Sequence, residues 1–296
     1  MEKDSLSLVW WNTSLSPPTT TATTNKFTLS KDERILLCSQ IIKTWLDSNY
    51  DFICLGEVAA SDVDYLVNSL NIIESDYTFV SGTEIVGKLV FDTCILVKKG
   101  YEYSLELNRA KNLIFNSADS NVKVGQRFEF YLPNIREILV LYLSHWPSQQ
   151  RTKDSTYNSI AQDLRAEVNK DLELRHNVIL LGDYNVEPHH PSMITGLQAS
   201  REKELVKYRR NLFYNPFWKF LAASQYEEEG CHGTYHLRKA GLFNSWHMID
   251  QILISKKLLN KKWKFKDEFV QIVDINAGLN DPISDHLAVS VFIERA

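Results

Sequence analysis

The chain has 296 residues, a formal net charge of −4 and 44% hydrophobic residues. This hydrophobic content excludes a disordered chain, and no apolar run is long enough to cross a bilayer, so we expect no membrane span. The acidic balance does not by itself indicate a nucleic-acid binder, although an acidic site can coexist with basic patches elsewhere.

The cysteines lack metal-type spacing, and three of them lie inside apolar runs. They therefore predict buried free thiols in a reducing compartment. With no hydrophobic signal segment at the N-terminus, this pattern favours a cytoplasmic protein. The four positions are Cys38, Cys54, Cys94 and Cys231.

The N-terminal part alternates between strand and helix signals. Ser5–Asn12 is apolar and ends on a polar residue, which predicts a strand, and the Pro/Thr-rich residues 17–24 predict a low-complexity loop. Ser30 and Glu33 form a capping-box pattern, which predicts a helix that continues to about residue 47.

The middle of the chain predicts a sheet built from short strands with antiparallel hairpins. We expect these strands at residues 51–55, 77–81, 92–98, 101–107, 125–132 and 138–145, and a short helix at 62–70. A long helix over residues 154–175 then leads into a buried apolar strand that begins at Val178.

Residues 201–221 differ in character, because they are basic and aromatic and predict two short helices broken near Pro216. Strand signals return at residues 234–236, 248–255 and 287–294. With no internal linker, the chain predicts one α/β (α+β) domain over residues 1–296, with a basic and aromatic insertion at about 198–222.

The central strand ends in a polar pair that could carry chemistry. Gly182 ends the apolar run, and Asp183 and Asn185 follow it one residue apart. A carboxylate and a carboxamide that point the same way can hold a hard cation or a water beside it. In isolation, however, Gly-Asp-x-Asn is more typical of an ordinary turn.

The same design recurs at other strand ends. Each residue alone is more typical of a cap, a turn or a solvated charge, but six or more in one chain indicate a common site. These strand-end residues are Asn12, Glu57, His145, Asp183 with Asn185, Asp250, and Asp285 with His286.

With these motifs in this order, nearly the whole chain resembles the endonuclease/exonuclease/phosphatase superfamily, the DNase I-like metal phosphoesterases. The resemblance implies a four-layer αββα sandwich with two mostly antiparallel sheets. It also implies a divalent cation, Mg²⁺ or Mn²⁺, and hydrolysis of a phosphate ester by an activated water.

Roles carry over residue by residue. Glu57 resembles the family's principal metal carboxylate, with Asn12 and Asp285 beside it. Asp183 and Asn185 resemble the pair that orients the attacking water and holds the phosphate. Asp250 and His286 resemble a carboxylate–imidazole pair, in which the carboxylate fixes the tautomer of the ring.

Two further residues leave alternatives open. His145 resembles the second histidine of the DNase-like and phosphatase branches, which contacts the scissile phosphate, but a structural histidine at a strand end is the alternative. Asp92 could supply the carboxylate behind this histidine, or it could be a turn residue. Gln251 departs from the family, which often has an aromatic residue after the aspartate.

The substrate is the least determined property, and we expect DNA or RNA. In the insertion, Lys207, Arg209 and Arg210 could contact a phosphate backbone, whereas its aromatics could equally pack inward. The lysine-rich residues 256–266 are typical of a solvated face. The alternatives are an enzyme for a small or lipid phosphate ester, and a binding module, which should have lost part of the ligand set; no protein partner is indicated.

Overall fold

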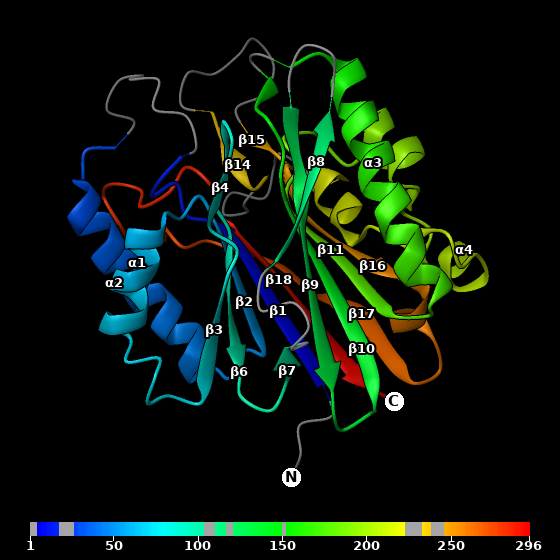
Figure 1. Ribbon diagram of the computed structural model, residues 1–296, viewed down its shortest axis with the longest axis horizontal. Helices are drawn as coiled ribbons and strands as arrows, with labels where there is room; N and C mark the ends of the chain where they lie inside the picture. Colours follow the sequence, from blue (N-terminus) through cyan, green and yellow to red (C-terminus); the bar gives the residue numbers. More distant parts are fainter. Residues whose placement is uncertain are drawn as a thin grey trace.

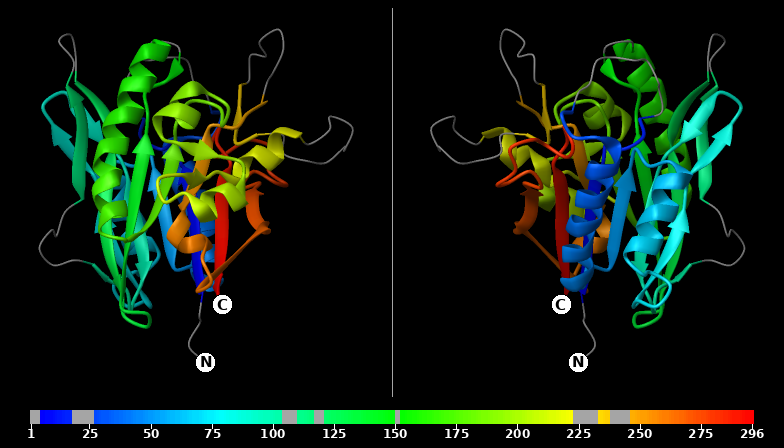
Figure 2. Two further views of the ribbon diagram at one scale, coloured as in Figure 1. Left: turned by 90° about the vertical axis from the view of Figure 1, so that its right-hand side faces the viewer. Right: turned by 90° about the vertical axis from the view of Figure 1, so that its left-hand side faces the viewer.

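The computed structural model describes residues 5–17, 27–103, 110–116, 121–149, 152–222, 233–237 and 246–296. Two β-sheets pack face to face, and helices cover their outer faces (Figures 1 and 2). α1 (Lys31–Asp47) and α2 (Ala60–Ser69) cover the first sheet, and α3 (Asp154–Glu173) covers the second. The predicted αββα sandwich is therefore confirmed.

The first sheet has six strands in the order β17-β18-β1-β2-β6-β3. Only β1 and β2 run parallel, and their register sets Asn12 opposite Gly56; the remaining pairs are antiparallel. The strands are β1 (Ser5–Asn12), β2 (Phe52–Gly56), β3 (Tyr77–Ser81), β6 (Cys94–Lys98), β17 (Trp263–Val273) and β18 (Ala288–Arg295).

The second sheet has the order β12-β13-β16-β11-β10-β9-β7, with β8 also paired to β9. The pairs β10–β11 and β12–β13 are parallel, and the others are antiparallel. The strands are β7 (Glu102–Tyr103), β8 (Lys111–Asn116), β9 (Asn121–Leu132), β10 (Glu137–His145), β11 (Asn177–Asp183), β12 (Ala199–Ser200), β13 (Phe213–Tyr214) and β16 (Asp250–Ser255).

Two small hairpins complete the strands. β4 (Glu84–Val86) pairs with β5 (Leu89–Phe91), and β14 (Tyr235–His236) pairs with β15 (Trp246–His247). The second hairpin contacts a predicted site residue, because Tyr235 also bridges to His286.

The apolar strands bury three cores. The largest fills the space between the two sheets and includes Trp10, Phe128 and Leu141. The other two lie beneath the helices, where Trp11 packs against Trp45 with ring centroids 5.7 Å apart. Trp10 and Trp11 are thus core residues, and burial of this many large apolar side chains is the main force that holds the sheets together.

The predicted capping box at the start of α1 is confirmed. Ser30 Oγ accepts from Glu33 N at 3.2 Å, and Ser30 N donates to Glu33 Oε2 at 2.8 Å. Reciprocal bonds of this kind satisfy backbone donors that the first helical turn leaves free.

The structure contains several elements that the sequence did not predict in this form. Residues 256–266 form η5 (Lys256–Leu259) and the start of β17, where Trp263 and Phe265 are buried between outward lysines. The insertion holds α4 (Lys203–Tyr208) and η4 (Pro216–Ala222), the two expected helices, with β12 and β13 added. β8, the β4–β5 hairpin and η3 (Ser192–Gly196) were not predicted.

Other expectations fall partly outside the described residues, namely the 17–24 tract, the end of the 101–107 strand and Cys231. Cys38, Cys54 and Cys94 are buried and free, as predicted. In the described part of the chain, no helix is both long enough and apolar enough to cross a membrane.

Candidate active site

Strand register brings the polar strand ends to one edge of the sandwich, the upper edge in Figure 1. His145 at the end of β10 lies opposite Asp183 at the end of β11, because these strands are parallel. β16 runs antiparallel to β11 and therefore begins there, with Asp250 opposite Asp183. The parallel pair β1–β2 delivers Asn12 and the residue after Gly56 from the other sheet.

Asn12 joins the two sheets at this edge. Its Nδ2 donates to Glu57 Oε1 and to Asp183 Oδ2, each at 3.2 Å. Glu57 has a φ of 54°, in the left-handed region that a non-glycine residue rarely adopts, so local contacts must hold it there. One such contact is the bond from Ser16 N to Glu57 O, at 2.8 Å.

The Gly-Asp-Tyr-Asn turn depends on its glycine. Gly182 has a φ of 154°, and a Cβ at this position would lie 1.9 Å from Ser144 O. The turn then folds back on itself, since Asn185 N donates to Asp183 Oδ1 at 2.8 Å. Asn185 Nδ2 donates to Trp146 O at 2.8 Å, which fixes the amide plane.

Asp183 is buried, and its acidity is perturbed. Burial and the negative charge of Asp250 raise the pKa of Asp183 to about 6, although His286 and His145 act in the opposite direction. A buried carboxyl group with a pKa this close to neutrality can exchange protons at physiological pH.

Asp250 and His286 form a closed pair. His286 Nδ1 lies 2.8 Å from Asp250 Oδ2, and Trp10 Nε1 donates to Asp250 Oδ1 at 2.8 Å, so both carboxylate oxygens are used. Burial alone would lower the pKa of His286, but Asp250 and Asp183 outweigh it and raise that pKa to about 10. The imidazole is therefore positively charged at neutral pH, with Nε2 3.8 Å from Asp183 Oδ2.

A second pair faces the first. His145 Nδ1 lies 2.8 Å from Asp92 Oδ2, and His145 Nε2 lies 3.4 Å from Glu57 Oε1. Burial would raise the pKa of Asp92, but His145 and Lys123 outweigh it and hold that pKa at about 2. The pKa of His145 is raised because the attraction of Asp92 outweighs burial.

Several residues that support the site were not found from the sequence. Lys123 Nζ lies 2.8 Å from Asp92 Oδ1, yet nothing in the alternating pattern of β9 distinguishes this lysine. Ser14 Oγ donates to Asp285 Oδ1 at 2.6 Å, and Thr234 Oγ1 accepts from Asp250 N at 2.9 Å. Thr234 lies in the sequence Gly233-Thr234-Tyr235, and Ser14 lies two residues after Asn12; these neighbourhoods were the signals that could have suggested the two hydroxyls.

The donor set could hold a divalent cation. Asp183 lies within 4.8 Å of Asp250 and His286, but those two residues already neutralise each other, so the oxygen donors that remain are Asp183 and Glu57, which Asn12 joins. Carboxylate and amide oxygens are the donors that hard divalent cations prefer.

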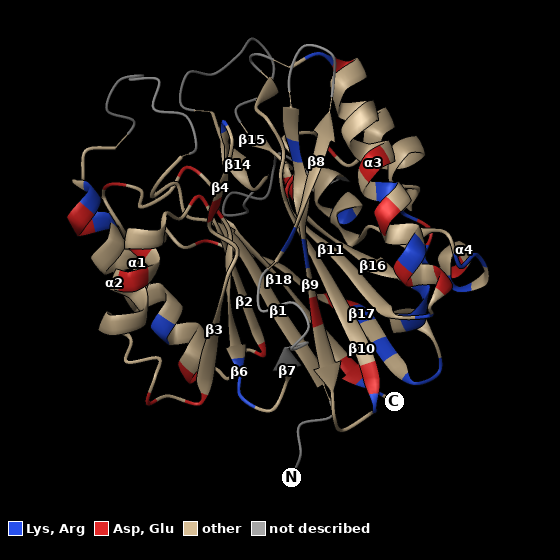
Figure 3. Ribbon diagram, viewed as in Figure 1, with Lys and Arg blue, Asp and Glu red and all other residues tan. Residues whose placement is uncertain are grey.

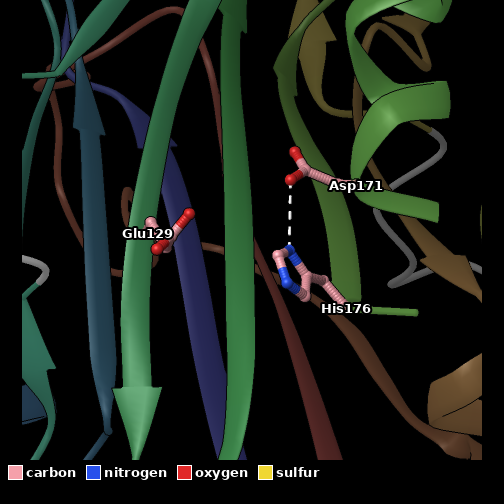
Figure 4. Close-up of side chains that lie close together, drawn as sticks. All are labelled: Glu129, Asp171 and His176. Atoms are coloured by element: carbon pink, nitrogen blue, oxygen red, sulfur yellow. Dashed lines mark hydrogen bonds and ion pairs between the residues drawn. The ribbon is translucent and has the colours of Figure 1, made fainter. Parts of the chain in front are cut away.

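A second group of this kind, Glu129, Asp171 and His176, lies on the second sheet and the end of α3 (Figure 4). Arg127 already occupies it, with Nε 2.8 Å from Asp171 Oδ2 and Nη2 2.7 Å from Asp171 Oδ1. His176 Nδ1 lies 3.1 Å from Asp171 Oδ1, the bond drawn in Figure 4. Because the guanidinium supplies the positive charge, we interpret this cluster as structural.

We call the edge of the sandwich that carries Asp183, Asp250 and His286 the candidate catalytic edge. The structure does not bring Lys207, Arg209 and Arg210 to it. β13, which follows them, pairs Phe213 with Ser255, at the opposite end of β16 from Asp250. The aromatics of the insertion mostly pack inward, since Phe213, Tyr214 and Phe217 are buried while Tyr208 is 80% exposed. Among the described residues, His189, His190 and His236 belong to no group of three metal-type side chains.

The family model described as Endonuclease/Exonuclease/phosphatase family matches residues 19–276. The chain belongs to this family. No curated protein matches this endonuclease/exonuclease/phosphatase protein.

Solved structures resemble this family member in fold. The human Nocturnin catalytic domain with bound sulfate anion has 14% identity and a TM-score of 0.63, over 99% of this chain and 96% of that one. Truncated Caenorhabditis elegans TDP2 has 15% identity and a TM-score of 0.61, over 98% and 97%. D. rerio TDP2 complexed with single strand DNA product has 16% identity and a TM-score of 0.59, over 99% and 100%.

Gln251, the departure from the family pattern, is fully integrated. Its Nε2 donates to Val186 O at 2.8 Å, and its Oε1 accepts from Asn215 Nδ2 at 2.8 Å. In this family member, the hydrogen bonds of Gln251 thus join β16 to the insertion and to the loop after Asn185.

Proposed function

We propose that this protein is a divalent-metal-dependent phosphodiesterase that hydrolyses DNA or RNA phosphodiester bonds by an activated water. The observation that carries the proposal is the buried Asp183–Asp250–His286 group beside Glu57 and Asn12 at one edge of the sandwich. Phosphoester hydrolysis needs a base for water and positive charge for the phosphate, and this edge contains both kinds of group.

Asp183 is the proposed general base. Its carboxyl group has a pKa of about 6, so at neutral pH it is mostly ionised yet basic enough to accept a proton from water. The bond from Asn185 N to Asp183 Oδ1 holds one oxygen in place and directs the other toward Asn12 and His286.

His286 and His145 are the proposed contacts for the phosphate oxygens. The pKa of about 10 keeps His286 protonated, and its bond to Asp250 leaves Nε2–H to donate. His145 is oriented in the same way by Asp92, and its Nε2 faces Glu57. Fixed donors of this kind stabilise negative charge as it develops in the transition state.

Glu57, Asn12 and Asp285 are the residues we propose to hold the cation, Mg²⁺ or Mn²⁺. When bound, such a cation supplies positive charge to the phosphate and lowers the pKa of water. The support is chemical, because the three side chains offer hard oxygen atoms and Glu57 is already oriented by Asn12 Nδ2.

The choice of nucleic acid rests on a structure of the same fold. D. rerio TDP2, which shares this fold, was crystallised with a single strand DNA product. A small or lipid phosphate ester is the alternative substrate, since one fold supports several substrates.

Product analysis tests the proposal. The purified protein is incubated with Mg²⁺ or with EDTA against DNA, RNA and a panel of phosphomonoesters and lipid phosphates. We expect Mg²⁺-dependent cleavage of a polynucleotide, which Glu57→Gln abolishes and which Asp183→Asn slows by about 10²–10⁴-fold. Full activity in EDTA would overturn the metal assignment. Turnover of phosphomonoesters or lipid phosphates without cleavage of DNA or RNA would show that the substrate is a small or lipid phosphate ester.

Folding must be verified for both variants, because each changes a site residue. Circular dichroism and thermal unfolding in EDTA serve this purpose. Lys43→Ala, an exposed change on α1, provides a matched control that should keep full activity.

A further inference from the structure

A cluster of cations lies at the end of the second sheet opposite the catalytic edge, around α4, η5 and the turn into β17 (Figure 3). Contacts make the cluster continuous, because Lys256 Nζ donates to Tyr208 O at 3.3 Å, and Lys257 and Lys262 each lie 3.1 Å from Glu137. We define this basic end as Arg175, Lys207, Arg209, Arg210, Lys256, Lys257, Lys261 and Lys262.

Few carboxylates balance these cations. Glu137 contacts two of them and Glu204 contacts Lys207, whereas Arg209, Arg210 and Lys261 have no carboxylate partner in the described part of the chain. The whole chain carries a net charge of −4, so this group of cations is a local exception to the acidic balance of the protein. A surface of this kind attracts polyanions.

The distance between the two ends follows from β16. Asp250 pairs with Asp183 at the catalytic edge, and Ser255, five residues later, pairs with Phe213 beside the basic end. At about 3.4 Å per residue, these positions lie roughly 17 Å apart along the strand.

The insertion connects the two ends along the sheet edge. At the catalytic side, Asn215 Nδ2 donates to Gln251 Oε1 at 2.8 Å, and Gln251 is the neighbour of Asp250 in β16. At the other side, α4 contributes Lys207 and leads into Arg209 and Arg210. The insertion therefore extends from the catalytic edge to the basic end.

We propose that the basic end anchors the phosphate backbone of a nucleic-acid substrate that extends beyond the scissile bond. This inference rests on the proposed function, and it places Arg209 and Arg210 at a contact distant from the scissile bond. A polymer can reach both ends at once, whereas a bilayer that rested on the basic end would leave the catalytic edge facing away from its lipids. The separation of about 17 Å corresponds to about five base pairs at 3.4 Å each.

The inference predicts that affinity depends on substrate length. Binding to a 20-base-pair duplex and to a four-base-pair hairpin is measured in EDTA as a function of salt, so catalysis is not required. The salt slope is the rate at which the logarithm of the binding constant falls with the logarithm of the salt concentration. The double variant Arg209→Ala/Arg210→Ala should reduce this slope for the 20-base-pair duplex by about two, because each lost phosphate contact removes about 0.9 from it. The slope for the four-base-pair hairpin should not decrease.

Two further variants sharpen the test. Lys261→Ala, on the neighbouring turn, should reduce the slope for the 20-mer by about one. Lys43→Glu changes the net charge by the same two units as the double variant, but on α1, which covers the other sheet, and it should leave the slope unchanged. Equal effects of Lys43→Glu and the double variant would show that only net charge matters and would overturn the inference.

Other results would also contradict the inference. If the double variant left the salt slope for the 20-base-pair duplex unchanged, or reduced the slope for the four-base-pair hairpin equally, the proposal that the basic end anchors the substrate would be overturned. Loss of binding to phosphatidylserine vesicles with intact duplex binding would reassign the surface to a membrane. Because binding is measured without turnover, failure of nucleic-acid cleavage, which concerns the proposed function, remains distinguishable from failure of the anchor.

Discussion

Asp92→Asn is the change whose consequences follow most directly from the structure. The carboxylate is only 2% exposed, and its two oxygens each accept from a donor at 2.8 Å, one from Lys123 Nζ and one from His145 Nδ1. Asparagine offers one acceptor and one donor, so its amide nitrogen must face a donor. Either the lysine loses its partner or the imidazole loses its orientation.

Two arguments give the size of the effect on stability. The pKa of Asp92 falls from the ordinary 3.8 to about 2, which corresponds to roughly 2 kcal/mol at about 1.4 kcal/mol per pKa unit. Removing one partner from a buried ion pair costs about 3–5 kcal/mol, because the other charge remains buried. We therefore expect Asp92→Asn to lower the free energy of unfolding by about 2–5 kcal/mol at pH 7.

The sign of the pH dependence follows from linkage. The pKa of Asp92 is depressed in the folded protein, so its stabilisation is fully present above about pH 4 and is lost as the pH falls toward 2. The difference between wild type and variant should thus be constant from about pH 5 to 6 and shrink below pH 4, and it should also decline above about pH 6.5 as His145, whose pKa Asp92 raises, loses its proton. Catalysis should also suffer, with kcat reduced by about 10²-fold or more if His145 contacts the phosphate.

Urea unfolding in EDTA, followed by circular dichroism, measures the stability, and steady-state kinetics with Mg²⁺ measure kcat. Asp47→Asn is the control, because the Asp47–Lys43 pair is well exposed and such pairs contribute about 0–1 kcal/mol. If Asp92→Asn destabilised the protein no more than Asp47→Asn does, the reasoning about the buried pair would be refuted.

Three further predictions concern the other side of the site. Trp10→Phe removes the donor to Asp250 Oδ1 and should cost about 1–3 kcal/mol in urea unfolding, because a buried acceptor loses its partner. Gly182→Ala should markedly lower the thermal unfolding temperature and abolish activity, since its Cβ would meet Ser144 O; an unchanged melting temperature would contradict the geometry. Because the pKa of Asp183 is raised to about 6, kcat/KM should fall as the pH drops below about 6; a kcat/KM that does not change with pH would argue against Asp183 as the base. Asp183→Asn should raise the free energy of unfolding in EDTA above pH 6, because wild type must bury a charged carboxylate there.

The sequence by itself determined which residues stand at strand ends. Short apolar runs that stop at Asn12, Glu57, His145 and Asp183 identify strands locally, because buried strands need apolar side chains and their ends do not. The capping box of α1 was readable for the same reason, since both partners lie three residues apart. Local patterns of this kind require no knowledge of the rest of the fold.

Only the tertiary structure decided which distant residues meet. Lys123 reaches Asp92 across 31 positions and Trp10 reaches Asp250 across 240, and no periodicity encodes such contacts. The placement of Arg209 and Arg210 depended on which strand of the sheet β13 would pair with, and that pairing directed them away from the catalytic edge. Strand register is set by the packing of whole sheet faces, so a segment's position relative to the site follows from the assembled core and not from its own composition.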